Sequence, residues 1–290
     1  MTAHVLRWVL GELAQQRRVV LATVLNTSGS VPGKTGARLG MSSAAHAWVG
    51  TVGGAGLEHR VLQRCRELLV ESDRPFAEVL TYGLNKGAKG YEVTPLDSLC
   101  GGRVSIAVEV MIPMPHVHIM GGGHCGEALA STLHGLGWSY SVHDTRDEYV
   151  SIEKYPDAVE RSSATVANLL QGETAASLSR FSDILLLGHD WAEDQERLLG
   201  LLRALNEPGV LLNGSDHPRI GVIGSRSKWQ AFEATCRDEG LPQSLLDQVI
   251  CPIGLNIGAQ SPEEIAVAVA AQIMSLHKSV DPSEPTWRQS

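Results

Sequence analysis

One glycine-rich turn constrains the fold of this chain more than any other feature. Gly121, Gly123 and Gly126 form a G-x-G-x-x-G pattern, with an apolar run at 116–120 before it and a helical pattern to about residue 136 after it. In a strand–turn–helix unit, the first glycine permits the tight turn and the second lets the backbone approach a phosphate. The third lets the helix pack close to the strand. The pattern predicts a Rossmann-type unit in which the start of the helix favours an anion.

Strands and helices alternate after this turn. The predicted strands lie at 116–120, 139–143, 184–187, 220–223 and 249–251, and the predicted helices at 193–205, 228–238 and 262–277. The last helix has a strong start signal, because Ser261 and Glu264 form a capping box around Pro262. Alternation of this kind is typical of a parallel sheet covered on both faces.

The residues around the turn leave its ligand open. Asp144 ends the second strand 18 residues after Gly126, where its carboxylate could accept hydrogen bonds from ribose hydroxyls. His124 and Cys125 stand where small apolar residues usually lie under a pyrophosphate. A Rossmann-like domain without a dinucleotide is therefore an equally good interpretation, with His124 either a ligand contact or a polar turn residue.

The amino-terminal half has a different pattern. Its predicted helices lie at 3–16 and 58–71, and its predicted strands at 18–25, 38–41, 47–52, 77–82 and 103–111. Three glycine-rich segments join them, at 27–41, 50–58 and 99–104. One such segment is usually a tight turn, but three in one small domain favour a site where free amides meet an anion. The candidate residues are Gly29, Ser30, Lys34, Gly53, Gly54, Gly101 and Gly102.

Four side chains in this half are open to two interpretations each. Cys100 has Arg103 nearby, which could lower the pKa of the thiol and make it a ligand or nucleophile, but a buried inert thiol is commoner. Glu58 opens a helix, where the helix dipole stabilises a carboxylate, and it could also accept a proton. Lys34 and Arg38 could bind phosphate or could be solvated. No catalytic residue is certain, and Cys100 and Glu58 are the candidates.

Prolines at 113 and 115 mark a domain boundary. We expect an α/β protein of two domains with a cleft between them. The expected parts are a mixed α/β domain with glycine-rich loops at 1–112, a linker at 113–115, a Rossmann-like parallel-sheet domain at 116–280 and a flexible tail at 281–290.

Composition excludes several classes of partner. Lys and Arg number 24 and Asp and Glu 32, so the net charge is −8, and no basic block offsets it. Nucleic acid and anionic membranes are therefore not expected partners. Scattered cysteines and the absence of a signal peptide or a long apolar run predict a reduced, cytoplasmic protein without structural zinc.

Together, these motifs resemble the XdhC/CoxI family, the accessory proteins of xanthine dehydrogenase and related molybdenum hydroxylases. In the first half, the resemblance rests on TSGSVPGKTGA, GTVGGAGLE and Cys100-Gly101-Gly102. In the second half, it rests on IMGGGHCGEALA, the DTR at 144–146, GHDWAED, IGVIGSRSK and PIGLNIGAQSPEEIAVAVAAQI. Each motif is weak alone, but their number and order over nearly the whole chain make the match specific.

The resemblance implies a maturation factor rather than a turnover enzyme. Such proteins bind the molybdenum cofactor, a pterin dithiolene with a phosphate, while a NifS-like cysteine desulfurase installs its terminal sulfur ligand. They then pass it to the apo form of a xanthine dehydrogenase-type hydroxylase. On that analogy, Cys100 contacts the molybdenum or its sulfur and the glycine loops hold the phosphate. The further contacts implied are His189, Asp190, Gly224, Ser225 and Arg226. The oligomeric state is open, with a homodimer as one option.

The chain departs from the family pattern at three positions. Gly33 stands where the family usually has Arg, Ala55 interrupts the second glycine run, and Asn256 stands where Asp is common. Loss of the Arg removes an anion contact unless Lys34 or Arg38 replaces it.

Two other functions stay open. An NAD(P)-dependent oxidoreductase would use the glycine-rich turn, and Asp144 would then favour NAD over NADP. A nucleotide-sensing adaptor would bind a partner enzyme without chemistry of its own.

Overall fold

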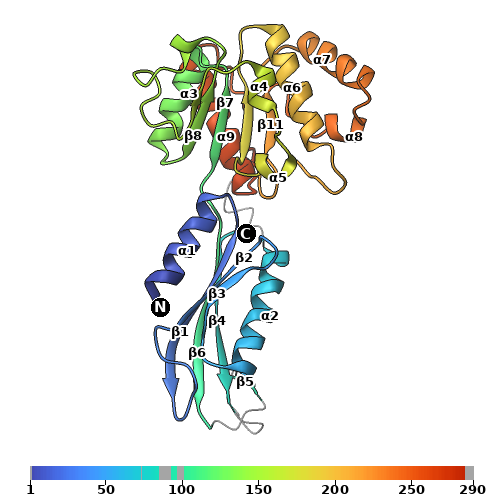
Figure 1. The fold of residues 1–290 in the computed structure, drawn as a ribbon. Helices are drawn as coiled ribbons and strands as arrows, with labels where there is room; N and C mark the ends of the chain where they lie inside the picture. Colours follow the sequence, from blue (N-terminus) through green and yellow to red (C-terminus); the bar gives the residue numbers. More distant parts are fainter. Residues whose placement is uncertain (1, 73, 85–92, 97–100, 285–290) are drawn as a thin grey trace. The chain divides into compact units, whose positions relative to one another are not determined.

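The chain folds into two compact units, which meet in sequence between Pro113 and Met114 (Figure 1). The computed structural model describes residues 2–72, 74–84, 93–96 and 101–284. Both units combine helices with a sheet, and the sheet of the second unit is entirely parallel. The predicted α/β class, with a mixed unit followed by a Rossmann-like unit, is therefore confirmed.

The first unit contains one six-stranded sheet, in the order β3-β2-β1-β6-β4-β5. Its strands are β1 (Val19–Ser28), β2 (Arg38–Ser42), β3 (Trp48–Gly50), β4 (Phe76–Gly83), β5 (Val93–Pro95) and β6 (Arg103–Met111), and its helices are α1 (Thr2–Ala14) and α2 (Ala55–Glu71). Neighbouring strands are antiparallel except β4 and β5.

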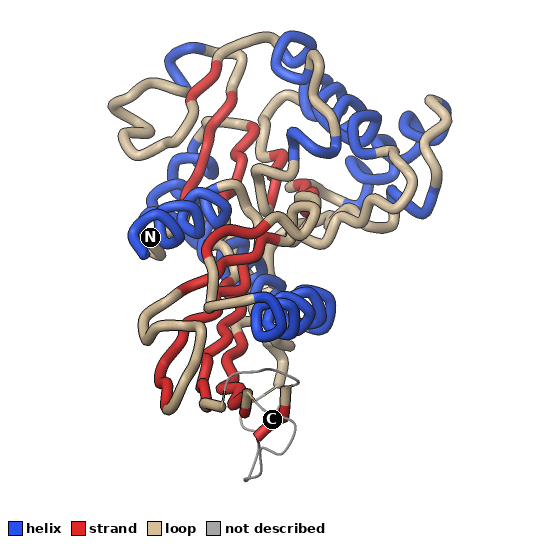
Figure 2. The backbone as a smooth tube through the Cα atoms, turned by 60° about the horizontal axis from the view of Figure 1, so that its bottom comes forward, coloured by secondary structure: helices blue, strands red, loops and turns tan. Residues whose placement is uncertain are grey.

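Helices cover both faces of this first sheet. Alternate residues of a strand point to opposite faces, so Val19 and Val20 in β1 belong to different cores. Val19 packs with Val5 of α1, and Val20 belongs to the core that includes Val61 of α2. Figures 1 and 2 show α1 and α2 on opposite sides of the strands.

The second unit contains a five-stranded parallel sheet, in the order β11-β10-β7-β8-β9. Its strands are β7 (His116–Met120), β8 (Ser139–His143), β9 (Arg161–Ser162), β10 (Asp183–Leu186) and β11 (Arg219–Val222). Its α-helices are α3 (His124–Gly135), α4 (Val166–Leu170), α5 (Ala175–Leu178), α6 (Trp191–Leu205), α7 (Arg226–Asp238), α8 (Gln243–Leu246) and α9 (Pro262–His277). The chain starts at the central strand β7, builds outward through β8 and β9, and then returns to β10. The strand order therefore reverses between β7 and β10, as in a Rossmann sheet.

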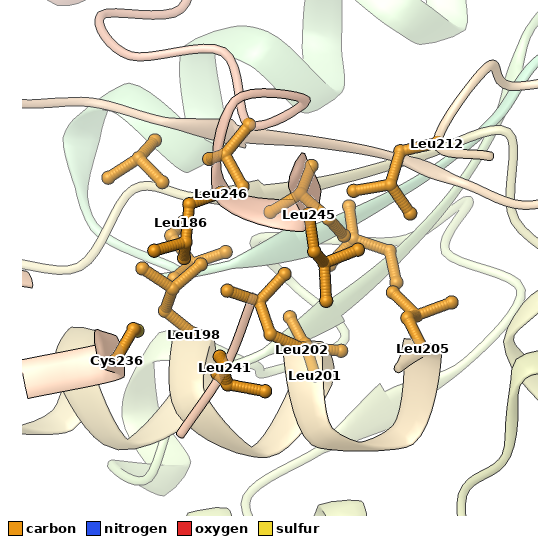
Figure 3. Packing of buried hydrophobic residues seen from close by; sticks show 14 of the residues in the cluster. Leu186, Leu198, Leu201, Leu202, Leu205, Leu212, Cys236, Leu241, Leu245 and Leu246 are labelled. Atoms are coloured by element: carbon orange, nitrogen blue, oxygen red, sulfur yellow. The ribbon is translucent and has the colours of Figure 1, made fainter. Parts of the chain in front are cut away.

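Two apolar layers bury the faces of this parallel sheet. On one face, α3 and α9 pack over Val117, Ile119 and Val142. On the other face, α6 packs its leucines against β10 and β11. Figure 3 shows this leucine-rich cluster, which includes Leu186 of β10 and Leu198 of α6. Burial on both faces explains the consecutive buried apolar residues Ile184, Leu185 and Leu186 of β10.

Several predicted elements agree with the structure. The strands at 103–111, 116–120 and 139–143 and the helix at 262–277 have the predicted bounds. The Ser261 hydroxyl accepts a hydrogen bond from the Glu264 amide, and the Glu264 carboxylate accepts one from the Ser261 amide, so the predicted capping box is present.

Other predicted bounds were wrong. Helices α2, α3, α6 and α7 begin two or more residues before their expected starts, because the residues between the preceding turn and the predicted helix already adopt helical geometry. The expected strand at 249–251 is one isolated bridge between Gly221 and Ile250. Pro252 has no N–H to continue that ladder. The short strands β5 and β9 and the short helices α4, α5 and α8 were not predicted.

Within the described residues, no helix combines the length and the apolar character that a membrane span requires.

Candidate functional site

A cavity of about 450 Å³ lies in the second unit, next to the residues that follow β7, β8 and β10. This is the edge at which open parallel sheets bind ligands, at the point where the strand order reverses. The volume falls within the range of small-molecule pockets, roughly 300–1,000 Å³. The cavity is lined by Gly121, Gly123, His124, Cys125, Asp144, Arg146, Tyr149, Leu187, Gly188, His189, Ile223 and Pro262.

The glycines of the turn have distinct geometric roles. Gly121 has a φ of 122°, and a Cβ atom there would lie 2.6 Å from the Gly188 amide nitrogen. A Cβ atom at Gly126 would lie 2.3 Å from the Gly121 carbonyl oxygen, so α3 packs directly on the turn. A Cβ atom at Gly123 would meet nothing within 4 Å. Gly123 thus leaves open space beside the start of α3, where a ligand can approach the backbone.

Helix α3 differs at its start from the other helices at this edge. Asp190, Ser225 and Ser261 cap α6, α7 and α9 with side-chain oxygens. The N-cap of α3 is Gly123, which has no side chain to accept from the first amides. These amides and the positive end of the helix dipole therefore remain available to an anion in the cavity.

Asp144 is almost completely buried and is hydrogen-bonded to donors of its own chain. Its Oδ1 accepts from Arg146 Nε at 2.8 Å and from the Arg146 amide at 3.1 Å. Its Oδ2 accepts from Arg146 Nη2 at 2.9 Å and from the Gly122 amide at 3.0 Å. Burial opposes ionisation, but these hydrogen bonds outweigh it and hold the pKa of Asp144 below its ordinary value.

Arg146 is the residue of this cluster that sequence analysis missed. The hydrogen bonds to Asp144 raise the pKa of its guanidinium, whose central carbon lies 3.7 Å from the centroid of the Tyr149 ring. The only sequence signal was its place in the DTR triplet. The Arg146 guanidinium is partly exposed at the cavity, whereas the Asp144 carboxylate is buried.

Two histidines and one cysteine line the cavity. His124 is the first residue of α3, and His189 precedes the N-cap of α6. Both side chains line the cavity and are exposed. Burial, together with the charge of Glu263, raises the pKa of the Cys125 thiol, so this cysteine is not poised as a thiolate.

Other predicted contacts do not line this cavity. Asp190 caps α6 and Ser225 caps α7, so both side chains serve helix starts. A Cβ atom at Gly224 would lie 2.7 Å from Cδ of Lys228, which places this glycine against a lysine stem. Arg226 is the first residue of α7, and Ile223 is the lining residue that this strand end provides.

A buried ion pair supports the loop at Gly188. Asp194 and Arg197 are almost completely buried, and their Oδ1 and Nη1 atoms lie 3.0 Å apart. Lys228 Nζ lies 2.8 Å from the other carboxylate oxygen of Asp194. A Cβ atom at Gly188 would lie 2.3 Å from Asp194 Oδ1, so the loop rests directly on the ion pair. This support was missed, although GHDWAED contains Asp194 and IGVIGSRSK contains Lys228.

The three glycine-rich segments of the first unit meet backbone to backbone. A Cβ atom at Gly29 would lie 3.0 Å from the Gly102 Cα, and one at Gly102 would lie 2.7 Å from the Ser30 carbonyl oxygen. A Cβ atom at Gly53 would lie 2.1 Å from the Gly33 Cα. A Cβ atom at Gly33 itself would lie 2.3 Å from the Val52 carbonyl oxygen, which explains why this departure from the family pattern is a glycine in this chain.

Gly54, which follows Gly53, is the N-cap of α2 and lies against the ring of Pro32.

Lys34 and Arg38 lie together beside these loops. Both line a smaller cavity of about 180 Å³, with Thr51 on its wall. Glu58 lies in the first turn of α2, where its carboxylate accepts a hydrogen bond from the Thr51 hydroxyl. The two cations that could replace the missing Arg are therefore at one pocket, and Glu58 is hydrogen-bonded beside it.

Three expectations lack a structural description. Cys100 lies outside the described residues, as does its contact with any metal or sulfur. Gly101, beside it, has nothing within 4 Å of an added Cβ. The cleft between the two domains stays a prediction. Among the residues that are described, no group of three or more His, Cys, Asp and Glu side chains is arranged to hold a metal ion.

Comparison with protein families gives two matches. Residues 117–273, more than half of the chain, match the XdhC Rossmann domain, and residues 12–83 match the XdhC and CoxI family.

Two curated relatives are similar along the chain. Uncharacterized protein YqeB of Escherichia coli (strain K12) is 26% identical over 279 residues, which are 93% of this chain and 46% of that protein. A probable xanthine dehydrogenase subunit from Bacillus subtilis (strain 168) is 25% identical over 168 residues, which are 58% of this chain and 44% of that protein. The chain spans less than half the length of these relatives.

A solved structure of similar extent is a crystal structure described as a xanthine dehydrogenase from Bacillus halodurans. It aligns over 98% of both chains with 19% identity and a TM-score of 0.46.

Proposed function

Because the chain belongs to the XdhC and CoxI family, we propose that it is a maturation factor for a xanthine dehydrogenase-type molybdenum hydroxylase. It binds the molybdenum cofactor, protects it while a cysteine desulfurase adds the terminal sulfur, and delivers it to the apo-hydroxylase. The family match over more than half of the chain carries this proposal. The Bacillus subtilis relative, which is named as a probable xanthine dehydrogenase component, supports the choice of hydroxylase.

The first unit offers groups that fit the phosphate of such a cofactor. Lys34 and Arg38 supply two cations at one cavity of about 180 Å³, and Thr51, whose hydroxyl donates to Glu58, also lines that cavity. The glycine loops supply closely packed backbone beside it. When bound, the cofactor supplies the molybdenum centre and its dithiolene sulfurs. The chain would hold the phosphate through Lys34 and Arg38 and present Cys100 to the metal end.

Binding and release, rather than turnover, are the tasks in this role. The cations must hold the phosphate firmly enough to protect the cofactor and weakly enough to release it. Exposed Lys34 and partly exposed Arg38 suit such a reversible contact, because charges near solvent bind more weakly than buried ones.

Cofactor content of the purified protein tests the proposal. The full chain is purified from a host that makes the cofactor, and molybdenum and oxidised pterin are measured per chain. We expect near-stoichiometric pterin in the wild type. We also expect at least a tenfold loss in Cys100→Ala and in the double variant Lys34→Ala/Arg38→Ala. Cys251→Ala is the matched thiol control, because Cys251 packs beside the leucine-rich core of the second unit, and it should retain the pterin.

Three outcomes contradict parts of this proposal. Wild-type protein without pterin would contradict the chaperone function. Cys100→Ala with undiminished pterin would remove Cys100 from the site. The double variant with undiminished pterin would remove the phosphate contacts from the first unit.

The cavity of the second unit supports a second candidate, a nucleotide-dependent role as an oxidoreductase or sensing adaptor. The supporting observation is the uncapped start of α3 beside a cavity at the reversal of strand order. A change in nicotinamide absorbance with candidate substrates would favour the oxidoreductase. Nucleotide binding without such a change would favour the adaptor.

A further inference from the structure

The hydrogen bonds of Asp144 leave little capacity for a ligand. An ionised carboxylate has about four lone-pair sites. Asp144 already accepts four hydrogen bonds, three from Arg146 and one from the Gly122 amide. Its side chain is 3% exposed. A ribose diol would therefore have to displace donors of the chain itself before it could bind to this carboxylate.

Arg146 has the opposite property. Its Nε and Nη2 atoms are engaged by Asp144, and one side of its guanidinium lies over the Tyr149 ring. Among the described residues, Nη1 has no hydrogen-bond acceptor, and the side chain is 32% exposed and lines the cavity. The exposed part of Arg146 is therefore the Nη1 edge and the face opposite Tyr149. A guanidinium edge of this kind binds phosphate oxygens through charge-assisted hydrogen bonds.

The segment that carries Arg146 is fixed against the glycine-rich turn. A Cβ atom at Gly122 would lie 2.0 Å from the Tyr149 carbonyl oxygen, so this carbonyl rests on the turn. Lys154 Nζ lies 4.7 Å from the centroid of the same Tyr149 ring. The guanidinium is thus held by Asp144 and Tyr149 before a ligand arrives, which lowers the entropy cost of binding.

In Rossmann sheets, an acidic residue after the second strand recognises the ribose 2′-hydroxyl, and an Arg nearby accommodates a 2′-phosphate. We propose that the cavity of the second unit selects a dinucleotide that carries a 2′-phosphate, and that Arg146 is the residue that selects it. Asp144 serves as the group that positions Arg146. This reverses the preference for NAD that the sequence alone suggested. The inference concerns the second unit and does not depend on cofactor binding in the first.

Calorimetric titration of the full chain with NADP⁺ and NAD⁺ tests the proposal, because the two probes differ only in the 2′-phosphate. We expect NADP⁺ to bind at least tenfold more tightly. Arg146→Gln should weaken NADP⁺ binding at least tenfold and leave NAD⁺ binding within about twofold. Lys154→Gln is the matched control, because it removes a nearby cation that does not line the cavity. It should leave both affinities unchanged.

The Asp144→Asn variant tests whether Arg146 or Asp144 recognises the ribose end of the dinucleotide. The amide oxygen can still accept from the Gly122 amide, but the paired hydrogen bonds that hold the Arg146 guanidinium are lost. We expect weaker NADP⁺ binding in this variant, because the guanidinium is no longer fixed before the ligand arrives, and NAD⁺ binding within about twofold of the wild type. Circular dichroism checks that the variant is folded.

Several results would overturn the proposal. They are equal or tighter binding of NAD⁺, no binding of either dinucleotide to folded protein, or an equal loss of both affinities in Arg146→Gln. Loss of NAD⁺ binding in Asp144→Asn would assign the ribose to Asp144 instead. Pterin and molybdenum content, measured separately, reports on the proposed function, so each idea can fail without the other.

Discussion

Two glycines of the first unit are required by backbone contact. Gly53 has a φ of 113°, which side-chain-bearing residues rarely adopt, and an added Cβ would lie 2.1 Å from the Gly33 Cα. A Cβ at Gly33 would lie 2.3 Å from the Val52 carbonyl oxygen. Both clashes are with backbone, which cannot rotate away as a side chain can.

Gly53→Ala should therefore lower the free energy of unfolding by about 2–4 kcal/mol, from backbone strain and overpacking. Urea denaturation measures this change. Gly11→Ala is the matched control, because Gly11 lies inside α1 with nothing within 4 Å of an added Cβ. That variant should gain about 0.5–1 kcal/mol. Equal stability of Gly53→Ala and wild type would show that the loops are not in contact.

At the same scale, the sequence predicted the cavity residues that belong to a regular pattern. Gly121, Gly123 and Asp144 were expected at strand ends because the turn motif fixes their spacing. The role of Arg146 could not be predicted, because it depends on a side chain that folds back two positions along the chain. The sequence also could not show that the Asp144 carboxylate is fully hydrogen-bonded, because its donors come from two separate segments of the chain.

Among the elements, α9 shows the most direct link between sequence and structure. Its capping box satisfies amides that the helix leaves free at its start. Ser261→Ala should lower the free energy of unfolding of the second unit by about 1 kcal/mol. Urea denaturation midpoints measure it.

Ser275→Ala in the same helix is the control for this change. The Ser275 hydroxyl donates to the Gln272 carbonyl inside the helix, and alanine is the better helix former. It should therefore be neutral or slightly stabilising. An equal loss in both variants would contradict a specific capping role for Ser261.

Strands and helices differed in how well their bounds could be predicted. Turn-forming residues flank β7 and β8, with Pro115 before β7, Gly121 after it and Gly137 two residues before β8, so their bounds could be predicted. The starts of α3 and α7 lie inside glycine- and serine-rich turns, where composition does not distinguish a turn from the first helical residues. β5 and β9 are short edge strands of three and two residues, too short for a periodic pattern.

For the second unit as a whole, buried histidines set the dependence of stability on pH. Burial, with a smaller effect of Arg180, lowers the pKa of His116 from 6.5 to about 4. Burial also lowers the pKa of His118 and of His143. His116 is therefore neutral in the folded protein near pH 6. All three imidazoles bind protons less readily in the folded protein than in the unfolded chain, where a histidine has a pKa of about 6.5.

Stability should consequently be greatest above pH 6.5 and fall as the pH decreases toward 4. His116 alone contributes a loss on the order of 3 kcal/mol across this window. Urea denaturation at several pH values between 7.5 and 4.5 measures the slope. His118→Gln should make the slope shallower, and His59→Gln, which replaces an exposed residue of α2, should leave it unchanged. A pH-independent denaturation midpoint would contradict this account.

The division of the chain has a consequence for how such proteins can evolve. Among the residues that the structure describes, each apolar core lies wholly within one unit, and the two family matches fall on separate units. A gene rearrangement at the codons for Pro113 and Met114 would therefore cut no core. Such a rearrangement would keep the core residues of each half together, and the ligand specificities proposed for the two halves are encoded by separate stretches of the gene.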